Sequence, residues 1–270
     1  MGIYFYIFIF LIGLTVGSFF NVVIFRFKGS GTLKKVPDPL WRGRSKCLNC
    51  GSVIRWFDLI PVFSYFVLKR RCRKCKIRLS LLYPIVEAAT ATALLLLFLN
   101  NPTVSYLTVA SAFIVALLIL IIFLDVRYLI IPDKILILLA VAIVLRLNLN
   151  TTINITDFYR LFTVSLSNSL IFALGLTAFF GILYIVSKGR WLGLGDIKLI
   201  FLMGFLLGYP MGYLAVVAAV WLAAIFSVIL IIQKKATAKT EIPFGSFLSI
   251  ATIIFIIFNN ELQKIATYFQ

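Results

Sequence analysis

The stretch WLGLGDIK (191–198) places a carboxylate, Asp196, at the start of a long apolar run. A second acid is placed in a similar way upstream, where LDVRYLIIPD (124–133) puts Asp125 directly after another apolar run. An Asp at the centre of a bilayer costs about 2.5–3.5 kcal/mol on insertion scales, and less towards the interface. Two acids at such positions indicate a membrane-spanning chain that uses carboxylates.

The composition agrees with a membrane protein. Of the 270 residues, 62% are hydrophobic and 13% are charged, whereas soluble chains are about half apolar and about a quarter charged. The chain contains no His, which excludes Ser-His and Cys-His hydrolase chemistry and any His-metal site. Its chemistry must therefore use carboxylates, thiolates or the backbone.

The apolar runs predict an all-α polytopic membrane protein, because about twenty apolar residues cross a bilayer as a helix. The first run is too long for a signal-peptide core and lacks a cleavage site, so we expect it to be retained. The fourth and sixth are short and need neighbours or the interface to cover their ends. The eight predicted spans are 3–25, 81–99, 104–124, 134–149, 164–187, 197–209, 211–232 and 244–260.

The basic residues predict the orientation, because Lys and Arg favour the cytoplasmic side. Residues 26–78 contain fifteen of the 26 Lys and Arg and only two acids. This places the loop in the cytoplasm and the N-terminus outside, and brings Asp125 and Asp196 to the same, cytoplasmic, depth. Since the +17 net charge is concentrated here, we expect membrane lipid rather than nucleic acid as a partner.

Asp125 and Asp196 are a candidate catalytic pair. Two carboxylates within hydrogen-bond reach share one proton and titrate as a pair. The protonated member can then polarise a peptide carbonyl while the ionised one takes a proton from water, as in aspartic proteases. Spacing alone leaves a structural alternative open, in which each acid caps a helix or pairs with Arg127 or Lys198.

Other polar and small residues have mainly structural interpretations. Asp133, after Pro132, is predicted to cap the fourth span. Glu87, near the start of the second span, has three open roles: to support the site, bind substrate or pair with a loop Arg. Small-residue spacings let membrane helices pack closely, and they occur at Gly13 and Gly17 and at Gly204, Gly208 and Gly212.

All four cysteines form two C-x-x-C pairs separated by 21 residues: Cys47, Cys50, Cys72 and Cys75. This is the pattern of a four-thiolate tetrahedral zinc site. Because the loop is predicted to be cytoplasmic, stable disulfides are disfavoured. Four protein ligands leave no open position for water, so we expect a structural zinc that holds a loop with little core of its own.

Seven motifs in series resemble the bacterial type IV prepilin peptidases, the leader peptidase and N-methyltransferase family of G-x-G-D aspartic membrane proteases. They cover nearly the whole chain. They are GSFFNVVIFR (17–26), the paired C-x-x-C knuckles, DLIPVFSYF (58–66), SLLYPIVE (80–87), LDVRYLIIPD (124–133), GLGDIKL (193–199) and IPFGSFLSI (242–250).

The resemblance implies an inner-membrane enzyme that cleaves prepilins or pseudopilins on the cytoplasmic side, after a Gly that ends a short basic leader. Asp125 and Asp196 match the two catalytic aspartates of the family. Many members then methylate the new N-terminal residue, usually Phe, using S-adenosylmethionine. The cysteine loop is implicated in that step, although Leu48 replaces the usual Pro of the first knuckle. No donor-binding residue is carried over.

These inferences divide the chain into a first helix (1–25), a cytoplasmic zinc-binding loop domain implicated in methyl transfer (26–80) and a peptidase core (81–270). Three other functional classes lead to different expectations. A proton-coupled transporter with the two acids as a relay is expected to place them near the midplane and to show repeated halves. A thiol oxidoreductase needs its cysteines on the outer face. A zinc-loop scaffold without chemistry leaves the acids incidental.

Overall fold

The computed structural model describes residues 2–27, 45–47, 49–148, 166–234, 240–259 and 261–262. Part of the predicted basic loop (28–44), Leu48 and the outermost residues of three predicted spans lie outside these ranges. The described residues form two compact units, an N-terminal unit ending at Pro102 and a C-terminal unit beginning at Thr103.

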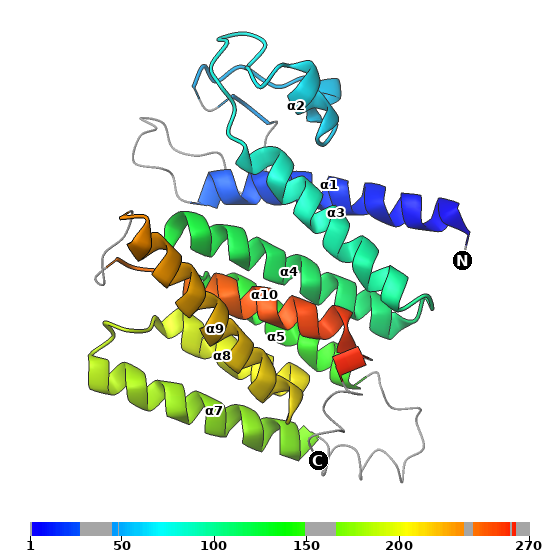
Figure 1. Cartoon of the computed structure of the whole chain (residues 1–270). Coiled ribbons are helices and arrows are strands. Elements are labelled where there is room, and N and C mark those ends of the chain that lie inside the picture. The colour runs from blue at the N-terminus through cyan, green and yellow to red at the C-terminus, as the bar shows by residue number, and fades with distance from the viewer. Residues whose placement is uncertain are drawn as a thin grey trace. The chain divides into compact units, whose positions relative to one another are not determined.

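The N-terminal unit contains two long apolar helices joined by the cysteine loop. Helix α1 (Ile3–Phe27) and helix α3 (Leu82–Asn100) pack against each other and cross in Figure 1. Between them, the loop forms a short 3-10 helix η1 (Trp56–Leu59) and a five-residue helix α2 (Phe63–Val67), which contact each other. Of the described loop residues 45–80, only Cys47 and Tyr65 are buried, so this loop has almost no apolar core.

Glycines let helices α1 and α3 approach at backbone distance. A Cβ atom added to Gly13 would lie 2.4 Å from the Cα of Ala91, and one added to Gly17 would lie 2.6 Å from the Cα of Glu87. Any larger side chain would push the helices apart, which confirms that this glycine spacing serves close packing. The contact also places Glu87 of α3 against Gly17 of α1. Gly17 lies one turn before Asn21 in the same helix.

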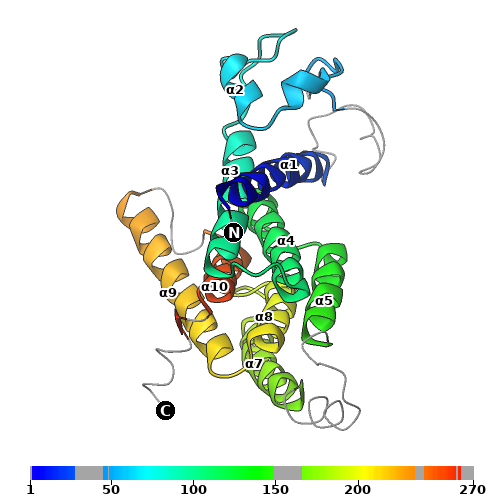
Figure 2. The same ribbon diagram turned by 90° about the vertical axis from the view of Figure 1, so that its right-hand side faces the viewer.

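The C-terminal unit is a bundle of six helices within the described ranges. These are α4 (Tyr106–Tyr128), α5 (Asp133–Asn148), α7 (Leu166–Ser187), α8 (Leu194–Leu207), α9 (Met211–Ile232) and α10 (Phe244–Ile257). Helix α10 contacts α4, α8 and α9, and it lies among them in Figure 2. Helix α8 also contacts α5 and α7, so α8 and α10 form the middle of the unit.

The core of this unit is apolar and follows the central helices. Leu124 of α4, Leu199 and Ile200 of α8 and Leu248 of α10 are fully buried. Many large apolar side chains are exposed on α5, α7 and α9 instead. In lipid such outward faces need no protein partner, because hydrocarbon is as apolar as they are.

Eight apolar helices therefore correspond to the eight predicted spans, although their ends differ. Five of them within the described ranges are long and apolar enough to cross a membrane on that basis alone: α1, α3, α4, the part of α7 from Asn168, and α9. Helices α5, α8 and α10 have 14 to 16 residues, which is short of a full crossing. The chain is a multi-pass membrane protein, and eight crossings remain a prediction.

Candidate functional site

Asp125 and Asp196 face each other across the backbone of Gly245. Asp125 is in the last turn of α4 and is buried, while Asp196 is in the first turn of α8 and is half-buried. A Cβ atom added to Gly245 would lie 3.1 Å from Oδ2 of Asp125 and 3.0 Å from Oδ1 of Asp196. Because both oxygens lie so near one point, the fold brings together two acids that are 71 residues apart in the chain.

The start of helix α10 holds the carboxylate of Asp125. The backbone N–H of Ser246 donates to Asp125 Oδ2 at 2.7 Å, and the Ser246 hydroxyl donates to the same oxygen at 3.0 Å. The first N–H groups of a helix have no partner within it, so they are free to bind an acid. These two bonds fix the orientation of Asp125 from the last helix of the bundle.

Ile131 covers the acids from the segment between α4 and α5. Its Cδ1 atom would lie 2.6 Å from a Cβ added to Gly245, and its Cβ would lie 3.1 Å from one added to Gly195. Both glycines are therefore required for Ile131 to approach the two helix N-termini this closely. An apolar side chain therefore lies close to the acid pair on this side.

The structure bears on the structural alternatives for these acids. Asp196 does accept a bond from the N–H of Gly193, at 3.1 Å, through Oδ2, which leaves Oδ1 directed towards Gly245. Lys198 instead pairs with Asp133 at 2.6 Å on an exposed surface. Asp133 was predicted to cap helix α5, but it is the first residue of that helix, and its ion pair links it to α8. Capping by Asp196 thus coexists with the pairing of the two acids.

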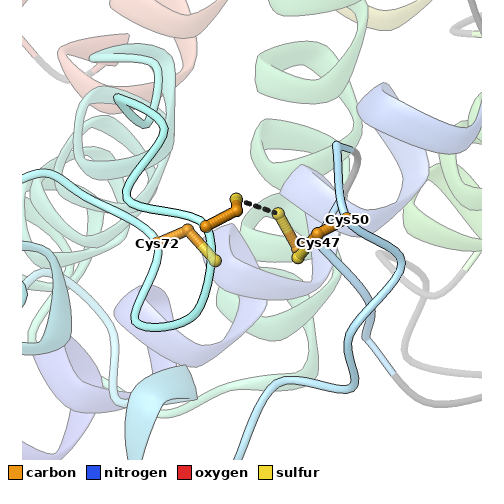
Figure 3. Close-up of side chains that lie close together, drawn as sticks. Cys47, Cys50 and Cys72 are labelled. Carbon is orange, nitrogen blue, oxygen red and sulfur yellow. Dashed lines mark hydrogen bonds between the residues drawn. The ribbon is translucent and has the colours of Figure 1, made fainter.

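The four cysteines gather in the loop of the N-terminal unit, as Figure 3 shows for three of them. All four sulfur atoms lie within 4.8 Å of one another, and the Cys47 and Cys75 sulfurs are 3.8 Å apart. Four thiolates at the usual zinc–sulfur distance of about 2.3 Å form a tetrahedron whose edges are roughly 3.8 Å. The set therefore fits a tetrahedral metal ion and brings together the four predicted ligands.

The two knuckles have the same backbone pattern. In the first, the Cys47 N–H donates to Ser52 O and the Gly51 N–H donates to Cys47 O, both at 2.9 Å. In the second, the Cys72 N–H donates to Ile77 O at 2.9 Å and the Lys76 N–H donates to Cys72 O at 3.0 Å. These backbone hydrogen bonds shape each knuckle, and its two sulfurs face those of the other knuckle although the loop has almost no apolar core.

The thiols of the cluster differ in their local chemistry. The Ser52 hydroxyl, 3.0 Å from the Cys50 sulfur, lowers the pKa of Cys50 to about 6. Burial raises the pKa of Cys47 to about 11, and hydrogen bonding to the Cys75 backbone lowers that of Cys72. A metal ion binds thiolates, so it would hold all four in the ionised form and displace the protons that remain.

A cavity of about 850 Å³, here called the loop cavity, lies between the cysteine loop and the adjoining ends of α1 and α3. Its volume is within the range of small-molecule sites. Glu87, whose role the sequence left open, lines it and is buried. Its Oε2 accepts from the N–H of Val62 at 2.7 Å, and its Oε1 accepts from Asn21 at 3.3 Å. Glu87 therefore joins the loop to both helices.

Sequence reasoning gave no role to Gly245, Ser246, Ile131 or Asn21. Gly245 and Ser246 belong to the motif IPFGSFLSI, and Ile131 belongs to LDVRYLIIPD, so only the family resemblance points to these segments. Asn21 lies within GSFFNVVIFR, where a polar residue inside an apolar helix was a usable signal. The contacts themselves have no local pattern, because Ser246 is 121 residues from Asp125.

Comparison with known proteins covers both units. The model of the bacterial peptidase A24 N-terminal domain matches residues 11–101, and that of the type IV leader peptidase family matches residues 112–228. No solved structure shows a significant match.

Several relatives carry the name prepilin leader peptidase/N-methyltransferase. The protein of Pseudomonas aeruginosa is 30% identical over 282 residues, covering 96% of this chain and 92% of the relative. That of Pseudomonas putida is 30% identical over 268 residues, covering 93% and 90%. That of Myxococcus xanthus is 38% identical over 133 residues, which are 48% of this chain and 37% of the relative. Together with the two family models, these matches show that the chain belongs to the type IV prepilin leader peptidase (peptidase A24) family, which is bacterial.

Proposed function

We propose that this protein is an aspartic endopeptidase that removes the leader from type IV prepilins or pseudopilins and then methylates the new N-terminal residue. The observation that carries the first activity is the meeting of Asp125 and Asp196 at Gly245. Both oxygens lie about 3 Å from one point that no side chain of Gly245 fills.

In the proposed cleavage step, the two acids hold one proton between them. The ionised carboxylate takes a proton from the attacking water, and the protonated one donates to the oxygen of the scissile carbonyl. Ser246 keeps Asp125 in place during this exchange, and Gly193 does the same for Asp196. The bare backbone at Gly245 lets both carboxylates come this close to one point, because a methyl group there would contact each of them.

The position of the acids suits a prepilin, which presents a basic leader followed by an apolar helix. Asp125 is near the end of α4 and Asp196 near the start of α8, so both lie where an apolar helix meets a polar connection. The basic residues of the cysteine loop support a cytoplasmic location for this end. We therefore propose an inner-membrane enzyme with its N-terminus outside and its peptidase site facing the cytoplasm.

For the second activity, the proposal rests on the names of the relatives and on the loop cavity. The methyl donor is S-adenosylmethionine, a sulfonium compound that supplies an electrophilic methyl group. The loop cavity is large enough for such a donor and is bounded by the metal-binding loop. A structural zinc bound by the cysteine cluster would hold the loop in the shape that encloses this space.

The test is incubation of the purified chain with a synthetic prepilin and a labelled methyl donor, scored for cleavage and for label transfer. We expect a shortened product that carries label on its N-terminal nitrogen. Cleavage without label would remove the methyltransferase activity from the proposal. Label without cleavage, or neither, would contradict the role given to the acid pair.

A further inference from the structure

Asn21 and Glu87 form a buried acceptor cluster at the helix end of the loop cavity. Asn21 is only 3% exposed and Glu87 only 6%, and both line the cavity. The Asn21 amide nitrogen donates to the carbonyl of Tyr83 at 3.0 Å and to Glu87 Oε1 at 3.3 Å. Since both of these partners are acceptors, the amide must present its nitrogen to them, and its orientation is fixed.

This orientation leaves an acceptor without a donor. Among the described residues, no group donates to Oδ1 of Asn21, which is fully enclosed. Buried polar atoms are normally hydrogen-bonded, so one that is not calls for an explanation such as a missing ligand. The neighbouring carboxylate of Glu87 accepts from the Asn21 amide, from the backbone N–H of Val62 and from the Ser18 side chain. A carboxylate offers about four lone-pair sites, so it can still accept from a further donor.

The chemistry of this cluster selects a particular ligand. An amide oxygen and a carboxylate side by side accept hydrogen bonds and attract positive charge, which describes a partner with several N–H donors, such as a primary ammonium group. The rings of Phe25 and Tyr83 stack at 4.3 Å and line the same cavity. Aromatic rings suit a cation or an apolar side chain next to it.

We propose that Asn21 and Glu87 bind the free α-amino group of the processed subunit during methyl transfer. This inference rests on the proposed methyltransferase activity and assigns its acceptor subsite. The ammonium gives one proton to the Glu87 carboxylate, and the nitrogen lone pair attacks the methyl carbon of the donor. The carbon–sulfur bond breaks, its electron pair stays on sulfur, and the sulfonium becomes a neutral thioether.

A structural role for Glu87 needs a separate test. Glu87 accepts from the N–H of Val62, a β-branched residue with a φ of 59°, which is an uncommon conformation. Glu87→Gln keeps an oxygen for that bond and removes the charge. Asn21→Ala removes the unpaired oxygen and leaves Glu87 in place. Thr90→Val, one turn further along α3 and outside the cavity, is the matched control for a buried polar change.

The experiment uses the full chain with a peptide that begins with Phe, either with a free amino group or N-acetylated. Binding is measured by calorimetry without the donor, and label transfer is measured with it. We expect the wild type to bind the free-amine peptide at least about tenfold more tightly than the acetylated one. Glu87→Gln and Asn21→Ala should abolish that preference, and Glu87→Gln should slow transfer roughly 100-fold. Thr90→Val should match the wild type.

The outcomes separate this inference from the proposed function. Wild-type rates of transfer in Glu87→Gln, or an unchanged preference for the free amine in both variants, would overturn the subsite. Equal loss of prepilin cleavage in these variants would also overturn it, because the damage would then be structural. If the wild type transfers no label, the methyltransferase proposal fails, and the binding measurement still decides whether this cluster recognises an amine.

Discussion

The acid pair of the C-terminal unit and the cysteine cluster of the N-terminal unit are built in opposite ways. Asp125 and Asp196 are held by the ends of helices that pack around a buried core, and by donors from Ser246 and Gly193. The cysteines are held by two short knuckles in a loop whose described residues include only two buried side chains. The first site is organised by the fold, whereas we expect the second to become rigid only when a metal ion binds.

The largest expected effect is on the acid pair. Asp125→Asn and Asp196→Asn remove the shared proton without changing size, so prepilin cleavage should fall by roughly 10²–10⁴-fold. Methyl transfer to a peptide that already has a free amine should persist. A mobility-shift assay in membranes measures the first effect, and circular dichroism checks the helices. Full cleavage by either variant would exclude the pair as the catalytic groups.

Removal of the metal should have the converse effect. We expect about one zinc per chain, and Cys72→Ser should release it, because a three-thiolate set holds the loop less well. Label transfer should then drop by an order of magnitude or more while cleavage continues, since the proposed cleavage step uses no cysteine. Metal analysis and thiol alkylation are the measurements. A zinc-free protein with four freely alkylated thiols would refute the site.

Gly245→Ala should disturb the acid site by geometry alone. The new methyl group would lie 2.6 Å from Ile131 and within 3.1 Å of both acids, so one of these groups must move. Overpacking of this kind costs about 1–3 kcal/mol, and a small displacement of reacting groups costs up to roughly 100-fold in rate. Gly181→Ala, where the added atom meets open space, is the control. Equal cleavage by the two variants would argue against close facing of the acids.

The smallest effect is expected at the exposed pair of Lys198 and Asp133. Ion pairs at an exposed surface contribute about 0–1 kcal/mol, and both side chains are more than half exposed. Lys198→Met should therefore leave the cleavage rate within about twofold of the wild type. A large loss of cleavage in this variant would show that Lys198 acts on Asp196 directly, although the structure pairs Lys198 with Asp133.

The sequence predicted the helices well because apolar length is a strong local signal. It misplaced two ends that matter for the site. Helix α4 continues past the apolar run to Tyr128, where Leu129 adopts a left-handed conformation and bonds back to Asp125 O. Helix α8 begins at Leu194, because Gly193 and Asp196 cap its first turn. Both acids therefore lie inside helices instead of just outside them.

The two sites differ in how much of them a local sequence pattern can predict. The cysteine spacing predicted a cluster because its ligands are close in sequence. Ser246 and Gly245 reach the acids only after α10 packs against α4 and α8, and no periodicity encodes that contact. The pairing of Asn21 with Glu87 likewise depends on the close crossing at Gly17. The short helices η1 and α2 were not predicted, because their apolar runs are too short to indicate a helix.

Gly51 and Lys76 occupy equivalent positions in the two knuckles, because their N–H groups donate to the carbonyls of Cys47 and Cys72. Their backbone conformations predict the order in which the two knuckles bind a metal ion. Both have positive φ, 66° and 58°, a conformation that is free of strain for glycine but costs roughly 1–2 kcal/mol for lysine. The knuckle with Cys47 and Cys50 thus carries no backbone strain at this position, whereas the knuckle with Cys72 and Cys75 carries it at Lys76, and we expect metal binding to offset that strain. We expect stepwise loading in that order, and faster loading when Lys76 is replaced by Gly.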